Sequence, residues 1–182
     1  MHSKLAAEIR KIGPFESLEQ EVFLNCWRTT DWLMRSAWAV LKGAELSPAL
    51  YNVLRIIRGA GPQGISCQDI AQRMITRDPD LTRLLDRLEK RRLVTRHRQQ
   101  RDRRVVKATI TEAGLAVLAQ LDDPIHQMHL RQLGHLGKQR LTQLLQLLEE
   151  VRGQPVAAIA PATDVAAAAG ADAHRADAEE HS

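Results

Sequence analysis

Arginine and lysine side chains are concentrated in one stretch of the chain. Thirteen of its 26 Lys and Arg residues lie between Arg73 and Lys107, where five acidic residues oppose them. Guanidinium groups pair well with phosphate oxygens, and a dense positive field attracts polyanions. This stretch therefore predicts binding of a polyanion, with double-stranded DNA as the leading candidate. A solvated charged face is the plainer interpretation, but it does not explain why the cations gather in one motif.

Two helices are predicted to position these cations. Ser66 and Asp69 have capping-box spacing, in which the hydroxyl accepts a backbone N–H and the carboxylate reaches back. Asp78 suits the N-cap of the second helix, and Pro79 suits its first position, where no N–H is needed. One face of this helix is apolar and the other polar, as a groove-reading helix requires. The apolar residues are Leu81, Leu84, Leu85 and Leu88, and the polar ones are Thr82, Arg83, Asp86 and Arg87.

Two strands joined by a charged loop are predicted next. Residues 93–95 and 105–110 are rich in β-branched side chains that alternate with polar ones. Residues 99–104 contain three arginines and no Asn-Gly or Asp-Gly signal, which predicts a longer hairpin loop. This loop is either a solvated turn or a wing that contacts the phosphate backbone or the minor groove.

Four motifs follow one another along the chain: the run from Asp78 to Glu89, then Leu93-Val94, Asp102-Arg103-Arg104, and Thr111-Glu112-Ala113-Gly114 before Leu115. In order and spacing of these motifs, residues 16–152 resemble the MarR family of bacterial winged helix-turn-helix transcriptional regulators. The combination of motifs is specific, whereas each motif alone is weak. In one departure, Arg92 stands where the family commonly has a glycine, and a left-handed helix end costs arginine about 1 kcal/mol more.

The resemblance implies a mainly α-helical fold: a winged helix-turn-helix with a two-stranded β-wing and long terminal dimerisation helices. It implies a homodimer on a pseudo-palindromic operator, with the second helix in the major groove and Arg104, oriented by Asp102, near the minor groove. The predicted function is sequence-specific binding to double-stranded DNA, with repression relieved by a small ligand as the expected effect. The expected DNA contacts are Arg77, Asp80, Thr82, Arg83, Arg87, Arg101, Asp102, Arg103 and Arg104.

Other functional classes are less well supported by the sequence. A winged-helix module for protein–protein interaction is the alternative. An enzyme is not predicted, because no nucleophile, base and pocket assemble and the chain has no phosphate-binding glycine loop, Cys-x-x-Cys or Gly-x-Ser-x-Gly. No cofactor is predicted. Three histidines invite a metal hypothesis, but no carboxylate or cysteine completes a ligand set: His126, His129 and His135.

The resemblance allows for a small aromatic or anionic effector, as the family often binds one between the winged domain and the dimer helices. Trp32, Tyr51, Arg55 and the two helical histidines could line its pocket, but ordinary packing is the favoured interpretation for each residue singly. Cys26 could sense oxidants, but a small buried hydrophobe is the favoured interpretation.

The rest of the chain suggests three parts. Residues 1–13 are polar and predict a loosely ordered N-terminus. Residues 14–152 form the MarR-like domain, with a DNA-binding lobe at about 46–110 and dimerisation helices at about 16–42 and 111–152, the second kinked at Pro124. The first helix, about 40 Å long, exceeds what a small core needs and predicts contact with another subunit. Residues 153–182, with twelve alanines, predict a disordered tail.

The cellular compartment is predicted from cysteine usage and apolar runs. Only two cysteines occur, Cys26 and Cys67, far apart in sequence. No apolar run approaches the ~18 residues that span a bilayer, and no signal peptide is recognised. A reducing cytoplasm is therefore the expected location.

Overall fold

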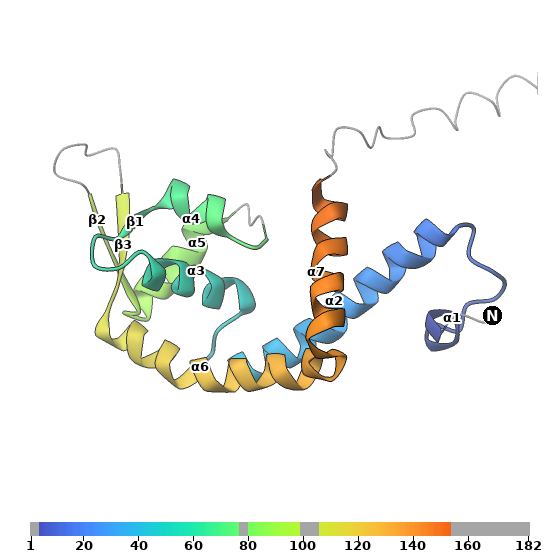
Figure 1. The fold of residues 1–182 in the computed structure, drawn as a ribbon. Coiled ribbons are helices and arrows are strands. Elements are labelled where there is room, and N and C mark those ends of the chain that lie inside the picture. Colours follow the sequence, from blue (N-terminus) through green and yellow to red (C-terminus); the bar gives the residue numbers. More distant parts are fainter. Residues whose placement is uncertain (1–3, 77–79, 99–105, 154–182) are drawn as a thin grey trace, which may run out of the picture. The chain divides into compact units, whose positions relative to one another are not determined.

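The computed structural model describes residues 4–76, 80–98 and 106–153 (Figure 1). The chain divides into two compact units, Met1–His135 and Leu136–Ser182. Helix α7 (Gly137–Gly153) belongs to the second unit and follows a 3₁₀ turn, η1 (Gly134–Leu136). The first unit contains α1 (Lys4–Glu8), α2 (Leu18–Lys42), α3 (Pro48–Gly59), β1 (Ile65–Ser66), α4 (Cys67–Arg73), α5 (Leu81–Lys90), β2 (Val94–Arg98), β3 (Val106–Ile110) and α6 (Glu112–Leu133).

Helix starts follow the expected capping chemistry, with one correction. Ser17, Ser47, Ser66 and Thr111 each accept a backbone N–H of the first turn on the side-chain oxygen. The N-cap of α5 is Asp80 and not Asp78, because Asp80 Oδ1 accepts the backbone N–H of Arg83 at 3.2 Å. The expected role of Pro79 lies outside the described residues.

The sheet has three strands, so the expectation of a two-stranded wing was incomplete. Strand β3 lies in the middle and pairs antiparallel with β1 and with β2, in the order β1-β3-β2. β1 is only two residues long, and an alternating apolar and polar pattern cannot be recognised in so short a strand. β2 runs from Val94 to Arg98 and is longer than predicted; its residue Arg96 pairs with Ala108 of β3.

The core of the first unit is almost wholly aliphatic and centres on α3. Val53, Leu54 and Ile57 of α3 are fully buried, and they pack with Leu85 and Leu88 of α5 in one cluster. The cluster extends to the sheet through Ala108 and to α6 through Leu118. Burial of these apolar side chains fixes α5 against α3, which leaves the opposite face of α5 in solvent.

The junction between α5, β2 and α6 is tight. Arg92 adopts a left-handed φ of 59°, so arginine accepts the conformation for which glycine is better suited. Thr111 Oγ1 donates to the Arg92 carbonyl at 2.7 Å, and the Thr111 N–H donates to the Leu93 carbonyl at 3.1 Å. A Cβ at Gly114 would lie 2.3 Å from the Leu93 oxygen, so only glycine fits there.

Three expectations about the helical parts need comment. The N-terminus is not wholly loose: α1 forms, and Leu5 is buried beside Leu24 and Trp27 of α2. Cys26 is exposed on the isolated chain and is not a buried hydrophobe. Helix α6 is continuous through Pro124.

The tail predicted at 153–182 lies outside the described residues except for Gly153. Within the described ranges, no helix is long and apolar enough to span a membrane.

Candidate nucleic-acid interface

Helix α5 presents the polar face that the sequence predicted. Leu84, Leu85 and Leu88 are buried in the core. Thr82, Arg83, Asp86 and Arg87 are all exposed. Within the described part of the chain, the side chains of Thr82 and Arg87 form no hydrogen bond or ion pair, so both are free to meet a ligand.

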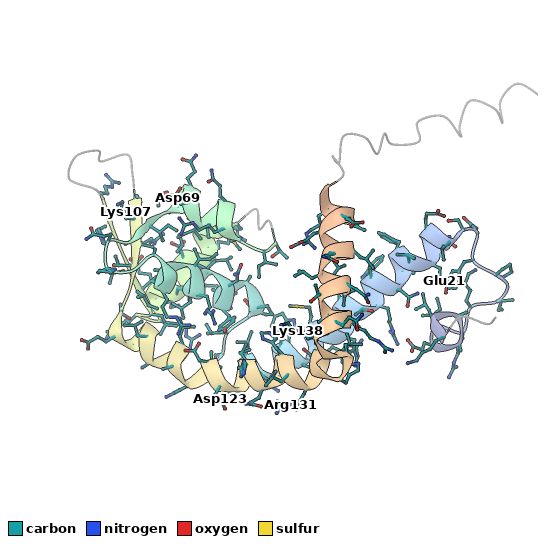
Figure 2. All side chains as sticks on the ribbon, in the orientation of Figure 1. Glu21, Asp69, Lys107, Asp123, Arg131 and Lys138 are labelled. Carbon is teal, nitrogen blue, oxygen red and sulfur yellow. The ribbon has the colours of Figure 1, made fainter. Side chains whose placement is uncertain are left out.

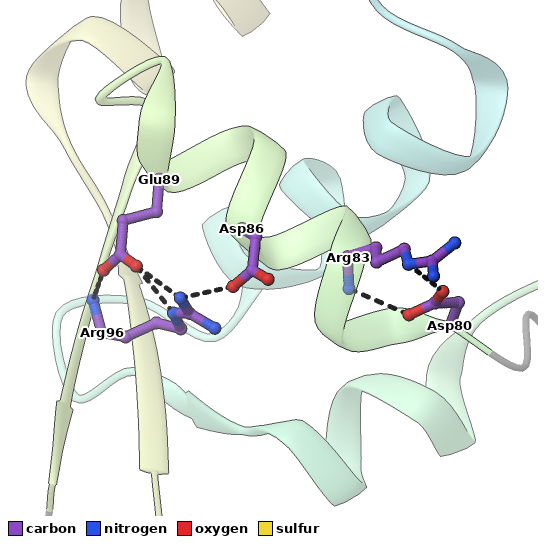
Figure 3. Close-up of polar contacts among 5 residues, drawn as sticks. All are labelled: Asp80, Arg83, Asp86, Glu89 and Arg96. Carbon is purple, nitrogen blue, oxygen red and sulfur yellow. Dashed lines mark hydrogen bonds and ion pairs between the residues drawn. The ribbon is translucent and has the colours of Figure 1, made fainter.

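Arg83 is held at the first turn of α5. Its Nε lies 2.8 Å from Oδ2 of Asp80, while the other carboxylate oxygen of Asp80 caps the helix (Figure 3). Sequence analysis grouped Asp80 with the residues that touch DNA. The geometry gives Asp80 a role inside the protein, as cap and as partner of Arg83.

Arg96 of β2 links the three-stranded sheet, here called the wing sheet, to α5 through ion pairs with Asp86 and Glu89 (Figure 3). We call these contacts the Arg96 clamp. Its Nη2 lies 2.6 Å from Asp86 Oδ1 and 2.6 Å from Glu89 Oε2, and its Nε donates to the same Glu89 oxygen at 2.9 Å. The backbone N–H of Arg96 donates to the other Glu89 oxygen at 3.0 Å. Hydrogen bonds from Arg96 hold the pKa of the Glu89 carboxyl below its usual value, and Glu89 and Asp86 in turn raise the pKa of Arg96. Both acids are therefore committed to the protein itself.

Sequence analysis missed Arg96 as a clamp. The signal was present, since Asp86 and Glu89 are three residues apart on one helical face and a cation follows in the adjoining strand. Sequence alone cannot say which of the nearby arginines turns inward. A second tie at this end of α5 was also missed: Arg91 donates to the carbonyls of Ala44 and Glu45 at 2.9 Å each.

The remaining predicted contacts are only partly visible. Arg77, Arg101, Asp102, Arg103 and Arg104 lie outside the described residues. Two described strands carry further cations. Arg98 is exposed at the end of β2. Lys107 lies on β3 (Figure 2), where it is the cross-strand partner of His97. The hairpin thus continues the positive charge of α5 along the chain.

A cavity of about 380 Å³ lies within the first unit, between residues of α2, α3 and α6. Of the residues considered for an effector pocket, Tyr51, Arg55 and His129 line this cavity, whereas Trp32 lines a different hollow and His126 is not part of this lining. Apolar side chains make most of its wall: Met34, Ala37, Leu41, Pro48, Ala49, Ile75, Ile125 and Met128.

Arg55 places a cation in this cavity. Its contacts with Tyr51 and Asp122 leave N–H donors available for a ligand. It donates to the Tyr51 hydroxyl at 3.1 Å and lies 3.6 Å from Asp122. Asp122 is bound by both terminal nitrogens of Arg58, at 2.8 and 2.9 Å. That contact lowers the pKa of the Asp122 carboxyl.

The cavity also touches the segment that leads into α5. Ile75 and Thr76 line it, and the Ile75 N–H donates to Asn52 Oδ1 of α3 at 3.0 Å. Asn52 is another residue that sequence analysis missed, because a 23-residue separation leaves no local signal. Among the described residues, no group of three or more His, Cys, Asp or Glu side chains is placed to hold a metal ion.

Comparison with known proteins shows what the chain is similar to. The MarR family sequence model matches residues 46–106. The crystal structure of a MarR transcription factor from Planctomyces limnophilus is 43% identical, with a TM-score of 0.58, and the match covers 75% of this chain and 98% of that one.

Two more distant structures share the fold. A mutant MarR from E. coli in complex with operator DNA is 23% identical, with a TM-score of 0.65, covering 82% of this chain and 99% of that one. BpsR of Bordetella bronchiseptica, whose DNA binding is regulated by 6-hydroxynicotinic acid, is 20% identical, with a TM-score of 0.69, covering 79% and 100%. The 43% identity to the Planctomyces limnophilus protein and the match to the family sequence model show that the chain belongs to the MarR family of DNA-binding transcriptional regulators.

Proposed function

We propose that the protein represses transcription by binding a pseudo-palindromic operator as a homodimer, and that a small anionic ligand relieves repression. The observation that carries the DNA-binding part is the arrangement of α5. Its leucines and the Arg96 clamp fix the helix, while Thr82, Arg83 and Arg87 face solvent. In this proposal, α5 enters the major groove, where an arginine can contact both acceptors of a guanine.

The first test removes Arg83. Arg83→Ala should cost roughly 1–3 kcal/mol of operator binding and relax base preference at one position per half-site. Arg131→Ala is the matched control, because it removes an exposed arginine from another helix, α6 (Figure 2). Binding of both variants to a randomised duplex library gives affinity and preference together. If Arg83→Ala left both intact, the placement of α5 in the major groove would be wrong.

The wing is proposed to contact the minor groove through Arg104, as the resemblance implies. Arg104→Ala should weaken binding to most sequences and flatten the salt dependence by about one unit per wing, or about two per dimer. A protein–protein interaction module, the alternative, would depend only weakly on salt. A titration of duplex affinity against salt therefore separates the two functions.

A second copy of the chain is the proposed partner of the exposed apolar helices. Many large apolar side chains exposed on one helix are typical of an interface. Helix α7 buries none of its residues within its unit. The exposed apolar residues on α2 are Leu18, Val22, Phe23, Trp27, Trp32, Met34 and Trp38, and those on α7 are Leu144, Leu145, Leu147, Leu148 and Val151.

Light scattering at micromolar concentration tests the dimer and should give about twice the 20.4 kDa chain mass. Leu145→Glu should shift the equilibrium to monomer, whereas Gln143→Glu, which adds the same charge to α7, should not. The two half-sites should then lie about 10 base pairs apart. A lasting monomer that bound a palindrome tightly would contradict the proposal.

The cavity beside α5 supports an anionic aromatic effector. Its apolar wall suits a flat ring, and Arg55 supplies a cation that Asp122 holds only loosely. The bond from Ile75 to Asn52 joins the cavity wall to the segment before α5. Occupation of the cavity could thus bias the position of the recognition helix.

A pair of related probes tests the effector class. 6-Hydroxynicotinate should stabilise the protein in a thermal shift assay and weaken its operator binding, while the neutral 6-hydroxynicotinamide should act much less. Arg55→Met should abolish the difference between the two probes and leave operator binding without ligand unchanged. Equal responses to both probes would argue against a role for Arg55 in selecting an anion.

A further inference from the structure

A carboxylate in the same helical turn holds the side chain of Arg83 and so positions its terminal N–H donors. Arg83 engages both oxygens of Asp80: its backbone N–H donates to Oδ1 at 3.2 Å and its Nε lies 2.8 Å from Oδ2 (Figure 3). Because Asp80 is the N-cap, its position is set by the start of α5. An arginine side chain is otherwise among the most flexible, so this contact removes rotamers before any ligand arrives.

The contact also selects which edge of the guanidinium is offered. Arginine has five N–H donors in a planar fork. With Nε directed at Asp80, the donors on Nη1 and Nη2 remain, and two parallel N–H groups match O6 and N7 of guanine in the major groove. Adenine presents an N6 donor in place of the O6 acceptor, so the same edge rejects it.

The other acids of α5 are already paired with a cation of the protein. Asp86 and Glu89 both bind Arg96 of β2, at 2.6 Å each. Pairing with Arg96 already offsets the negative charge of these carboxylates, which weakens them as acceptors for cytosine N4. The exposed groups left on this face are the hydroxyl of Thr82, the guanidinium groups of Arg83 and Arg87, and the ammonium of Lys90 in the last turn.

We propose that Asp80 is a specificity-determining residue that positions Arg83, so that α5 selects a guanine in each half-site. This inference rests on the DNA binding proposed above. Asp80 is then expected to have two opposing effects on DNA binding. The Asp80 carboxylate repels nearby phosphates and lowers affinity for any duplex, but it raises discrimination between bases by fixing Arg83.

Asp80→Asn separates the two effects. Asparagine is as good an N-cap as aspartate and keeps an oxygen for the Arg83 N–H, but it loses the charge that holds Nε. Affinity for random duplex should stay the same or rise. Preference for guanine over the other bases should fall about two- to fivefold, the range for loss of one exposed charge-assisted contact. Asp123→Asn removes one exposed carboxylate from α6 and should change neither preference nor melting temperature (Figure 2).

The experiment uses the full chain and an operator selected from a random library. Substituting 7-deazaguanine for the preferred guanine removes N7 and should weaken the wild type strongly, Asp80→Asn less, and Arg83→Ala not at all. The double variant should lose no more preference than Arg83→Ala alone. Asp80→Ser, which caps the helix but cannot reach Nε, gives a second measure if the asparagine variant folds poorly.

The outcomes distinguish this inference from the proposed function. If the wild type selects no sequence, the proposed DNA binding itself fails. If Arg83→Ala relaxes the preference for guanine but Asp80→Asn and Asp80→Ser keep it, Asp80 does not position Arg83. Equal loss of specific and random binding in the Asp80 variants would also overturn the inference, since it would indicate a purely structural cap.

Discussion

Replacement of Arg96 by methionine should destabilise the fold by releasing the wing sheet from α5. Methionine keeps the apolar stem and removes every donor. The side chain of Arg96 is 25% exposed and bridges Glu89, which is 37% exposed, and Asp86, which is 53% exposed. Hydrogen bonds to charged groups contribute about 1.5–3 kcal/mol, whereas fully exposed pairs contribute about 0.2–1 kcal/mol.

The partial exposure of the clamp sets the size of the expected loss. Water can solvate both carboxylates once Arg96 is gone, so the cost should stay below that of breaking a fully buried pair. We therefore expect the free energy of unfolding to fall by an intermediate amount, about 2 kcal/mol. In a chain of this length, that loss lowers the melting temperature by about 4–8 °C. Arg98→Met is the matched control, because Arg98 lies on the same strand, is exposed and forms no ion pair within the described residues.

Urea unfolding of Arg96→Met, Glu89→Gln and the double variant would measure the coupling directly. The two single losses should overlap, with an interaction energy of at least about 0.5 kcal/mol. The reasoning is refuted if Arg96→Met and Arg98→Met unfold at the same urea concentration, or if the single losses simply add.

Acid should weaken the same clamp. Arg96 lowers the pKa of Glu89 in the folded state from its ordinary value of 4.5. The stabilisation is therefore fully present above that value and is lost as pH falls through the lower folded pKa. The difference in melting temperature between wild type and Arg96→Met should accordingly narrow as pH is taken from 7 to below about 4, and a difference independent of pH would speak against it.

Three further substitutions have clear expected effects. Gly114→Ala should destabilise by about 1–3 kcal/mol or more, because its Cβ would meet the Leu93 oxygen, whereas Gly134→Ala has open space around it and should be nearly neutral in urea unfolding. Arg92→Gly should relieve the left-handed strain and raise the free energy of unfolding by about 0.5–1 kcal/mol, and an unchanged or lower value would count against that strain. Asp122→Asn should lower the melting temperature at pH 7 by releasing Arg58, and this effect should persist down to about pH 4 and shrink only as pH falls further through the folded pKa of Asp122, which lies below its ordinary 3.8; an equal loss at pH 7 and well below that pKa would mean that charge is not the cause.

The sequence by itself determined the features that depend on neighbouring residues. Helical spacing of Leu84, Leu85 and Leu88 predicted the buried face of α5, and the structure confirms it. Ser47 with Pro48 and the cap at Thr111 marked the starts of α3 and α6 correctly. These signals are local, because a helix period spans 3.6 residues and a cap binds an N–H two or three residues away.

Only the tertiary structure decided the features that bring distant residues together. β1 is a strand because β3 lies beside it, and two residues cannot signal that partner on their own. The N-cap of α5 moved to Asp80, and the α1 helix formed where Leu5 could be buried against α2. Arg96 reaches Asp86 and Glu89 because the chain reverses at Arg92, and the cavity beside α5 collects its lining from α2, α3, α6 and the segment after α4. Sequence spacing records which side chains are present, but packing of the shared core determines which of them meet.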